Sequence, residues 1–225
     1  MIYGNIRQGY FISRPNRFIA MVMLDGKEEV CHVKNTGRCK ELLTEGAIVF
    51  LEESQNPNRK TKYDLIAVYK GDRLINMDSQ APNKVVMEYL PRMFCDVTLI
   101  RPETKYNNSR FDFYVETEKD KIFLEVKGVT LEEKGVVRFP DAPTERGIKH
   151  IQELIACKKA GYQAYIIFVI QMEDVSYFEP NIATQPEFAK ELRLAKEAGV
   201  KILAFDCKVE PNSLVINQEV SCKII

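Results

Sequence analysis

Two acids and a lysine near the middle of the chain have the types and the spacing that metal-assisted chemistry requires. Asp112 lies in one alternating apolar run, and Glu125 and Lys127 lie two residues apart in the next. Residues two apart on a strand project from the same face, and neighbouring strands lie about 5 Å apart. Carboxylates hold Mg²⁺ together with a substrate phosphate, and the cation polarises the phosphoryl oxygen. The pattern indicates phosphodiester cleavage, with Asp112 and Glu125 as ligands of Mg²⁺ or Mn²⁺ and Lys127 orienting water or stabilising developing charge.

The same spacing also fits a plain solvated hairpin, whose mixed charges form surface ion pairs that add little stability. The two expected strands are Phe111–Glu116 and Ile122–Val126, and alternation should place Phe111 and Phe113 on one face. Gly128 closes the Glu-Val-Lys segment, so we expect these residues at the end of a strand, where sites are usually found.

Three charged residues are further candidates around this site. Arg110 shares a strand face with Asp112, where it forms either an ion pair with the acid or a phosphate contact. Glu103 is either a third metal ligand or a solvated loop residue. Glu88, on the helix expected to open this half of the chain, is a similar outside candidate.

A basic cluster opens the helix expected over Pro143–Ala160, whose apolar residues fall on one face. A helix N-terminus carries partial positive charge and free N–H groups, which suit a phosphate. We therefore expect Arg146, Lys149 and His150 to face phosphate. The alternative is a simple cap in which Thr144 begins the helix.

The first part of the chain consists of short strands separated by turn signals. The expected strands are Arg17–Leu24, Glu29–Lys34, Ala47–Glu53, Tyr63–Tyr69 and Arg73–Met77, with one helical turn at Cys39–Leu43. Five or so strands with a short helix between the third and fourth predict an oligonucleotide-binding-type barrel, with an SH3-like barrel as the alternative. We assign this all-β domain to residues 1–81.

Aromatic and basic residues are mixed along the barrel segment, as in barrels that bind nucleic acids by base stacking and backbone charge. Arg38 and Lys60 fall in expected loops and are predicted to contact phosphate, and Tyr10 is a weaker candidate for the same surface. Phe11 and Phe18 are expected in the core.

The pattern changes after the segment Gln80 to Asn83, where Asn83 is the expected N-cap of a helix. Three strands, the helix described above, the apolar strand Ala164–Ile170, the helix Glu187–Ala198 and the strand Val200–Phe205 follow. This order predicts an α/β sandwich over residues 82–225.

Composition limits the class of protein. The chain has 225 residues and a formal net charge of zero, so nucleic acid must bind through a local patch. The six cysteines include no C-x-x-C pair, which disfavours structural zinc. The first residues lack the pattern of a secretory signal, and no apolar run is long enough to span a membrane. We expect a cytoplasmic protein without a membrane partner.

Long stretches of the chain resemble the sugar fermentation stimulation protein (SfsA) family. They are RFIA (17–20), NTGRCKELL (35–43), KTKYDL (60–65), NNSRFDF (107–113), EVKGVTL (125–131) and FPDAPTERGIKHIQEL (139–154). Small departures from the family's usual residues occur at Cys39, Asn107, Gly128 and Gln185, and none of them is a candidate site residue.

The resemblance implies an oligonucleotide-binding-type barrel joined to a domain like the PD-(D/E)xK nucleases. In such nucleases the positions matching Asp112 and Glu125 bind the metal, and the position matching Lys127 is the motif lysine. The family is described as DNA-binding, with a proposed part in regulating sugar catabolism. We therefore expect a DNA-binding protein with a nuclease-like domain, and the alternative is an active Mg²⁺-dependent endonuclease or exonuclease. RNA is a weaker alternative partner, and the sequence leaves the oligomeric state open, a homodimer included.

Overall fold

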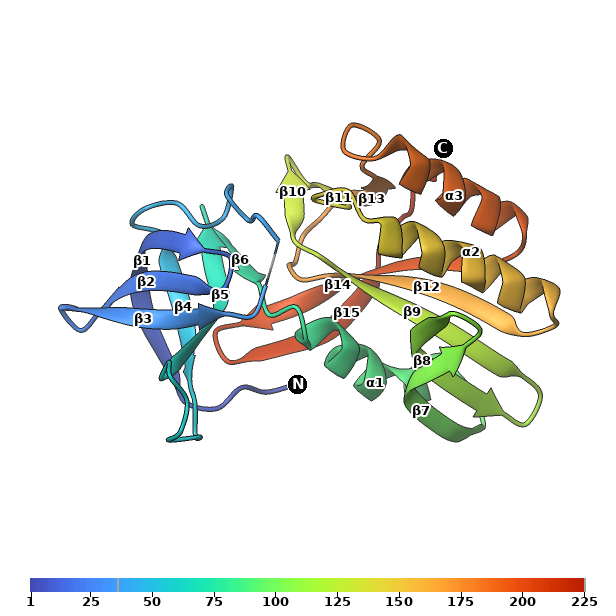
Figure 1. The fold of residues 1–225 in the computed structure, drawn as a ribbon, viewed down its shortest axis with the longest axis horizontal. Coiled ribbons are helices and arrows are strands. Elements are labelled where there is room, and N and C mark those ends of the chain that lie inside the picture. The colour runs from blue at the N-terminus through green and yellow to red at the C-terminus, as the bar shows by residue number, and fades with distance from the viewer. Residues whose placement is uncertain (36, 225) are drawn as a thin grey trace.

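The first domain is a closed β-barrel, seen at the left of Figure 1. This computed structural model describes residues 1–35 and 37–224, so Thr36 of the NTGRCKELL stretch lies outside the described residues. The sheet has the order β3-β2-β1-β4-β5-β6, and a parallel pairing of β3 with β5 closes it. Its strands are β1 (Ile6–Asn16), β2 (Ile19–Leu24), β3 (Lys27–Val33), β4 (Ile48–Glu53), β5 (Tyr63–Lys70) and β6 (Arg73–Asn76).

Local sequence explains the first hairpin of the barrel. Asp25 and Gly26 join β2 to β3 with positive φ angles of 51° and 78°, as a two-residue hairpin turn requires. Phe11 is buried as expected, but the prediction that Phe18 lies in the core is wrong. Phe18 belongs to the turn before β2, where the residue is 45% exposed and its ring lies beneath the guanidinium of Arg17.

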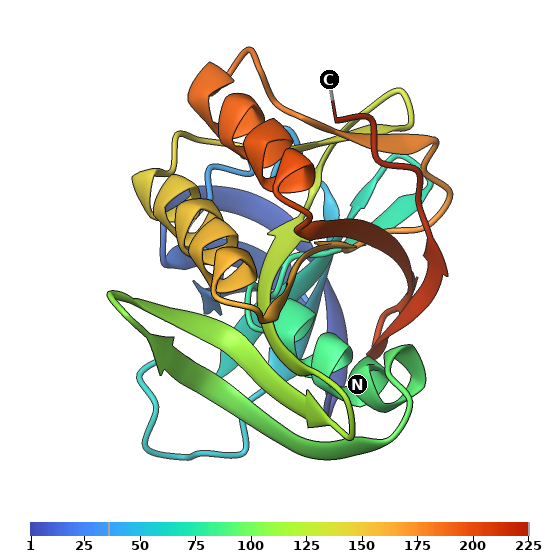
Figure 2. The same cartoon turned by 90° about the vertical axis from the view of Figure 1, so that its right-hand side faces the viewer.

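The second domain is a mixed six-stranded sheet with helices on both faces. The strand order is β15-β14-β12-β9-β8-β7, and α1 covers one face while α2 and α3 cover the other (Figures 1 and 2). A small sheet of order β10-β11-β13 lies beside it. The elements are α1 (Ala81–Met93), β7 (Val97–Tyr106), β8 (Ser109–Thr117), β9 (Lys121–Val129), β10 (Leu131–Glu133), β11 (Val136–Phe139), α2 (Glu145–Lys159), β12 (Gln163–Ile170), β13 (Tyr177–Pro180), α3 (Pro186–Glu197), β14 (Lys201–Glu210) and β15 (Ser213–Glu219).

The start of α1 differs from the prediction. The helix begins at Ala81 after Gln80, and Asn83 is not its N-cap. Pro82 is tolerated because the N–H groups of the first helical turn have no helical partner in any case. Asn83 therefore has its side chain free for another contact. Among the helices of residues 1–35 and 37–224, none combines the length and the apolar character needed to cross a bilayer.

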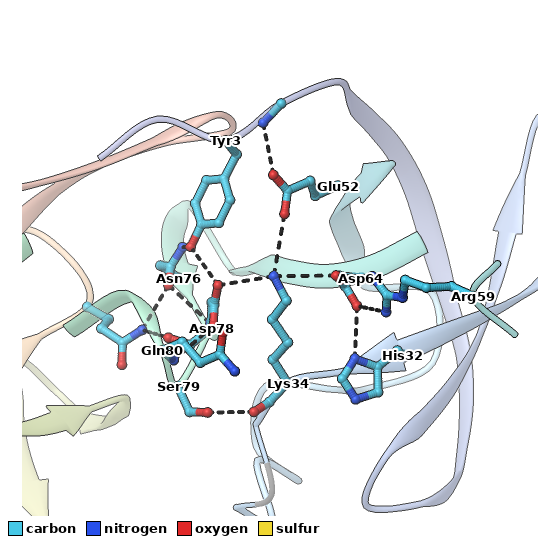
Figure 3. A network of polar contacts seen from close by, with 12 residues as sticks. Tyr3, His32, Lys34, Glu52, Arg59, Asp64, Asn76, Asp78, Ser79 and Gln80 are labelled. Carbon is cyan, nitrogen blue, oxygen red and sulfur yellow. Dashed lines mark hydrogen bonds and ion pairs between the residues drawn. The ribbon is translucent and has the colours of Figure 1, made fainter. Parts of the chain in front are cut away.

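A buried polar network joins the barrel to the second domain (Figure 3). The ammonium of Lys34 lies 3.4 Å from Asp64 and 3.5 Å from Asp78, measured to the nearest carboxylate oxygens. Gln171, which follows β12, donates to the side chain of Asn76 at 2.8 Å and to the carbonyl of Asp78 at 3.0 Å. The proposed domains are residues 1–81 and 82–225. The end of the first, around Asn76 and Asp78, is therefore held by side chains from both domains.

Candidate active site

The candidate site forms where β8 separates from β9. Their antiparallel ladder ends at the pair Phe113 and Leu124, and Phe113 is the residue that follows Asp112 on β8. From there the N–H of Val126 on β9 donates to Oδ2 of Asp112 at 2.8 Å, so a side chain replaces the ladder partner. The prediction that Phe111 and Phe113 share a face is wrong, because Phe111 packs in the core beneath α2 and Phe113 in the core beneath α1.

Asp112 is held from the α1 side of the sheet. The side-chain amide of Asn83 donates to Oδ1 of Asp112 at 2.8 Å. Burial raises the pKa of Asp112, and the neighbouring Glu125 carboxylate raises it further. Glu125 is therefore close enough to disfavour the charge on Asp112.

Glu125 is held from the α2 side and is only 2% exposed. Its Oε1 atom accepts hydrogen bonds from Lys127 on the same strand and from Nδ1 of His150 on α2. Burial alone would raise the pKa of Glu125, but these two partners outweigh burial and hold the pKa below its ordinary value. The other oxygen, Oε2, is buried and has no hydrogen-bond partner among the described residues.

The side chain of His150 lies in a different place from the one predicted, although its helix is found where it was expected. His150 is 5% exposed and contacts Glu125, so it does not face a phosphate at the surface. Arg146, one turn earlier, is exposed and its Nε lies 3.4 Å from Nε2 of His150. The N–H of Gly147 donates to Oγ1 of Thr144 at 3.0 Å, as the alternative of a simple cap predicts.

The other candidates of this domain are paired elsewhere. Arg110 forms an exposed ion pair with Glu103 at 2.7 Å, rather than with Asp112. Lys149 donates to a backbone carbonyl in the β7–β8 turn, Asn108, at 2.9 Å. Glu88 lies 2.7 Å from the N-terminal ammonium of Met1, so its carboxylate is not brought to Asp112.

The barrel candidates lie on the surface of the first domain. Arg38 and Lys60 are exposed, and Tyr10 is 51% exposed on β1 opposite Met23 of β2. They remain predictions for nucleic-acid contact.

The donor set fits a divalent cation held by two carboxylates. No group of three or more His, Cys, Asp or Glu side chains within residues 1–35 and 37–224 is arranged to hold a metal ion. Mg²⁺ and Mn²⁺ do not need such a group, because water and substrate phosphate supply the remaining oxygen ligands. The buried and unpartnered Oε2 of Glu125, an acid whose charge raises the pKa of Asp112, is the observation that fits a cation.

Sequence reasoning missed two residues that build the site. The sequence predicts Asn83 as a helix cap and gives no indication that His150 contacts Glu125. These contacts join residues 29 and 25 positions apart in the chain, so no local pattern contains them. The basic cluster at the start of α2 was the one signal that pointed to His150.

Comparisons with known proteins agree with this two-domain architecture. A family model described as "Sugar fermentation stimulation protein RE domain" matches residues 80–213, and one described as "SfsA N-terminal OB domain" matches residues 12–77. The chain belongs to the SfsA family. The predicted fold, an oligonucleotide-binding-type barrel followed by a nuclease-like α/β domain, is thereby confirmed.

SfsA relatives match the chain over its whole length. A sugar fermentation stimulation protein homolog of Clostridium beijerinckii is 63% identical and covers 98% of both chains. The homolog of Ruminiclostridium cellulolyticum is 58% identical over 100% of both. The solved structure of Pyrococcus furiosus SfsA in complex with Ca²⁺ superposes with a TM-score of 0.89 at 28% identity, covering 100% of this chain and 98% of that one.

Proposed function

We propose that this SfsA protein binds DNA and hydrolyses phosphodiester bonds with a divalent cation held by Asp112 and Glu125. The buried, unpartnered Oε2 of Glu125, an acid whose charge raises the pKa of Asp112, carries the proposal. A buried carboxylate oxygen without a partner is costly, and a cation is the partner that two converging carboxylates suit. The Pyrococcus furiosus relative was solved with Ca²⁺, which supports a divalent site. We propose Mg²⁺ or Mn²⁺ as the working cation.

The chain's own residues prepare the site. A divalent cation, when bound, supplies polarisation of the phosphodiester. Asn83 and the N–H of Val126 fix both oxygens of Asp112. The half-buried ammonium of Lys127 lies on Glu125, where it can orient water or stabilise charge on the phosphate.

DNA is the proposed partner, and the supporting features are local because the net charge is zero. Exposed cations occur on β8 at Arg110 and at the start of α2 at Arg146. The barrel adds Arg38, Lys60 and Tyr10, which suit backbone charge and base stacking. Binding should weaken steeply with salt, and competition with matched RNA strands tests the alternative partner. We also propose that the protein acts in the cytoplasm.

Cleavage of supercoiled plasmid and of labelled single strands, with Mg²⁺ or Mn²⁺, tests the proposal. We expect product from the unchanged protein, none from Asp112→Ala, and none from Lys127→Ala. Glu88→Gln is the matched control, because that carboxylate pairs with the N-terminus, and it should cut normally. Equal cutting by Asp112→Ala would point to a contaminating nuclease and sink the assignment.

A second candidate is a DNA-binding regulator of sugar catabolism that does not cleave. The name of the relatives, sugar fermentation stimulation protein homolog, favours it, and a nuclease-like fold does not by itself imply cleavage. It predicts salt-sensitive binding without product. Turnover at physiological Mg²⁺ would exclude it.

A further inference from the structure

We propose that His150 is a positioning residue, which fixes the Glu125 carboxylate so that its second oxygen faces the cation. The inference rests on the proposed function, since it concerns the cation that Glu125 holds. Oε1 of Glu125 is occupied by His150 and Lys127, and only Oε2 is left without a partner. A carboxylate whose first oxygen is fixed by two donors has little freedom to turn its second oxygen away.

His150 is better suited than Lys127 to fix this orientation. A lysine ammonium rotates freely at the end of a flexible stem, whereas the imidazole of His150 is rigid and buried. The ring packs edge-on against Phe111, with 6.1 Å between ring centroids, and belongs to α2, which is capped by Thr144. Its position is therefore set by the core and by the helix, independently of solvent.

Arg146 and Glu125 favour the same tautomer of His150. Arginine has no acceptor, so its Nε, 3.4 Å from Nε2 of His150, donates to that nitrogen. A neutral imidazole with Nε2 as acceptor carries its proton on Nδ1, which then donates to Glu125. The opposite tautomer would turn a lone pair toward the carboxylate. The contact from Arg146 is thus compatible with His150 donating to Glu125.

The first test measures Mn²⁺ affinity by calorimetry on the full chain without nucleic acid. In His150→Asn the amide nitrogen takes the place of Nδ1 and keeps the donor, whereas in His150→Gln it takes the place of Nε2 and loses contact with Glu125. Loss of such a supporting hydrogen bond costs about 10–100-fold in metal affinity. We therefore expect His150→Gln to bind Mn²⁺ more weakly by this factor, and His150→Asn to keep nearly the affinity of the unchanged protein. His32→Asn, which changes the chain's other histidine on the barrel, should leave the affinity unchanged.

The outcomes separate the two proposals. Equal Mn²⁺ affinity in folded His150→Gln and unchanged protein overturns the positioning role and leaves the proposed function standing. Absence of Mn²⁺ binding by the unchanged protein overturns both. Thermal unfolding without metal shows whether the two His150 variants are equally folded. If His150 served only in packing, Mn²⁺ affinity would fall equally in His150→Asn and His150→Gln, and this result would also overturn the inference.

The second test reads the tautomer directly. The chain has two histidines, so ¹⁵N-detected imidazole spectra contain two ring systems, which His32→Asn assigns. We expect His150 to carry its proton on Nδ1 and to leave Nε2 unprotonated. An unprotonated Nδ1 in the unchanged protein would overturn the role given to His150, and a proton on Nε2 would overturn the hydrogen bond from Arg146.

Discussion

The carboxylate of Asp112 accepts a hydrogen bond from the backbone N–H of Val126 at 2.8 Å, at the point where β8 leaves β9. The N–H would otherwise need a ladder partner, since an unpaired buried backbone group is costly. The side chain of Asp112 thus takes the place of a backbone partner where the β8–β9 pairing ends. This contact holds Asp112 near Glu125, within the sheet. The prediction that Glu125 and Lys127 lie at a strand end is wrong, because β9 continues to Val129.

Removing the charge of Asp112 should stabilise the metal-free protein. In Asp112→Asn the amide oxygen can still accept from Val126, and the amide of Asn83 can turn so that its oxygen accepts from the new NH2 group. The cost of burying the charge and the repulsion from Glu125 both disappear. We expect a gain of about 1 kcal/mol, or roughly 2–4 °C in Tm for a chain of this size. Thermal unfolding in chelator at neutral pH measures it, with the exposed Glu118→Gln as a control that stays within error.

The same variant should lose its response to cations. A ligand that binds the native state raises Tm, so Mg²⁺ or Mn²⁺ should stabilise the unchanged protein and leave Asp112→Asn unaffected. A lower Tm for Asp112→Asn in chelator would contradict the repulsion between the two acids.

Asn83→Asp should make the fold dependent on a cation. The new carboxylate would face Oδ1 of Asp112, where the amide now donates at 2.8 Å. We expect a loss of about 1–3 kcal/mol without metal, which Mn²⁺ should largely restore. Urea unfolding with and without Mn²⁺ measures this, and Asn58→Asp on the exposed barrel surface is the matched control. Equal stability of Asn83→Asp and unchanged protein in chelator would refute the assigned contact.

Alternating and continuous apolar runs predicted most long strands and both later helices, because burial on one or two faces leaves a periodic trace in the sequence. The small sheet left no such trace. Its strands β10, β11 and β13 have three or four residues, and β11 pairs with β13 across about 40 positions, as in Val136 with Tyr177. Tertiary contacts define such strands, so local patterns cannot.

The site could be predicted only in part for a related reason. Asp112, Glu125 and Lys127 were found because strand periodicity brings them together. The contacts from Asn83 and His150 depend on how α1 and α2 lie over opposite faces of the sheet. Asn83 also has the residue type of a helix cap, and that local interpretation hid its contact with Asp112.

Asp64 should stabilise the barrel in a pH-dependent way. Burial raises the pKa of Asp64, but hydrogen bonds from Arg59 and His32 and the charge of Lys34 lower it to about 2. Because the folded-state pKa lies below the ordinary value of 3.8, this stabilisation is present at neutral pH and is lost as pH falls through about 2. We expect Asp64→Asn to cost about 3 kcal/mol at pH 7.

The difference between Asp64→Asn and unchanged protein should shrink as pH falls from about 4 toward about 2. Urea unfolding followed by circular dichroism, at several pH values, measures it. The matched control is Asp25→Asn, whose carboxylate pairs with Arg7 but is 67% exposed, so its loss should cost no more than about 1 kcal/mol. A cost for Asp64→Asn that stayed constant with pH would mean that the ion pairs of Asp64 do not stabilise the barrel. Burial and packing would then account for the whole effect, because they do not depend on the charge of this carboxylate.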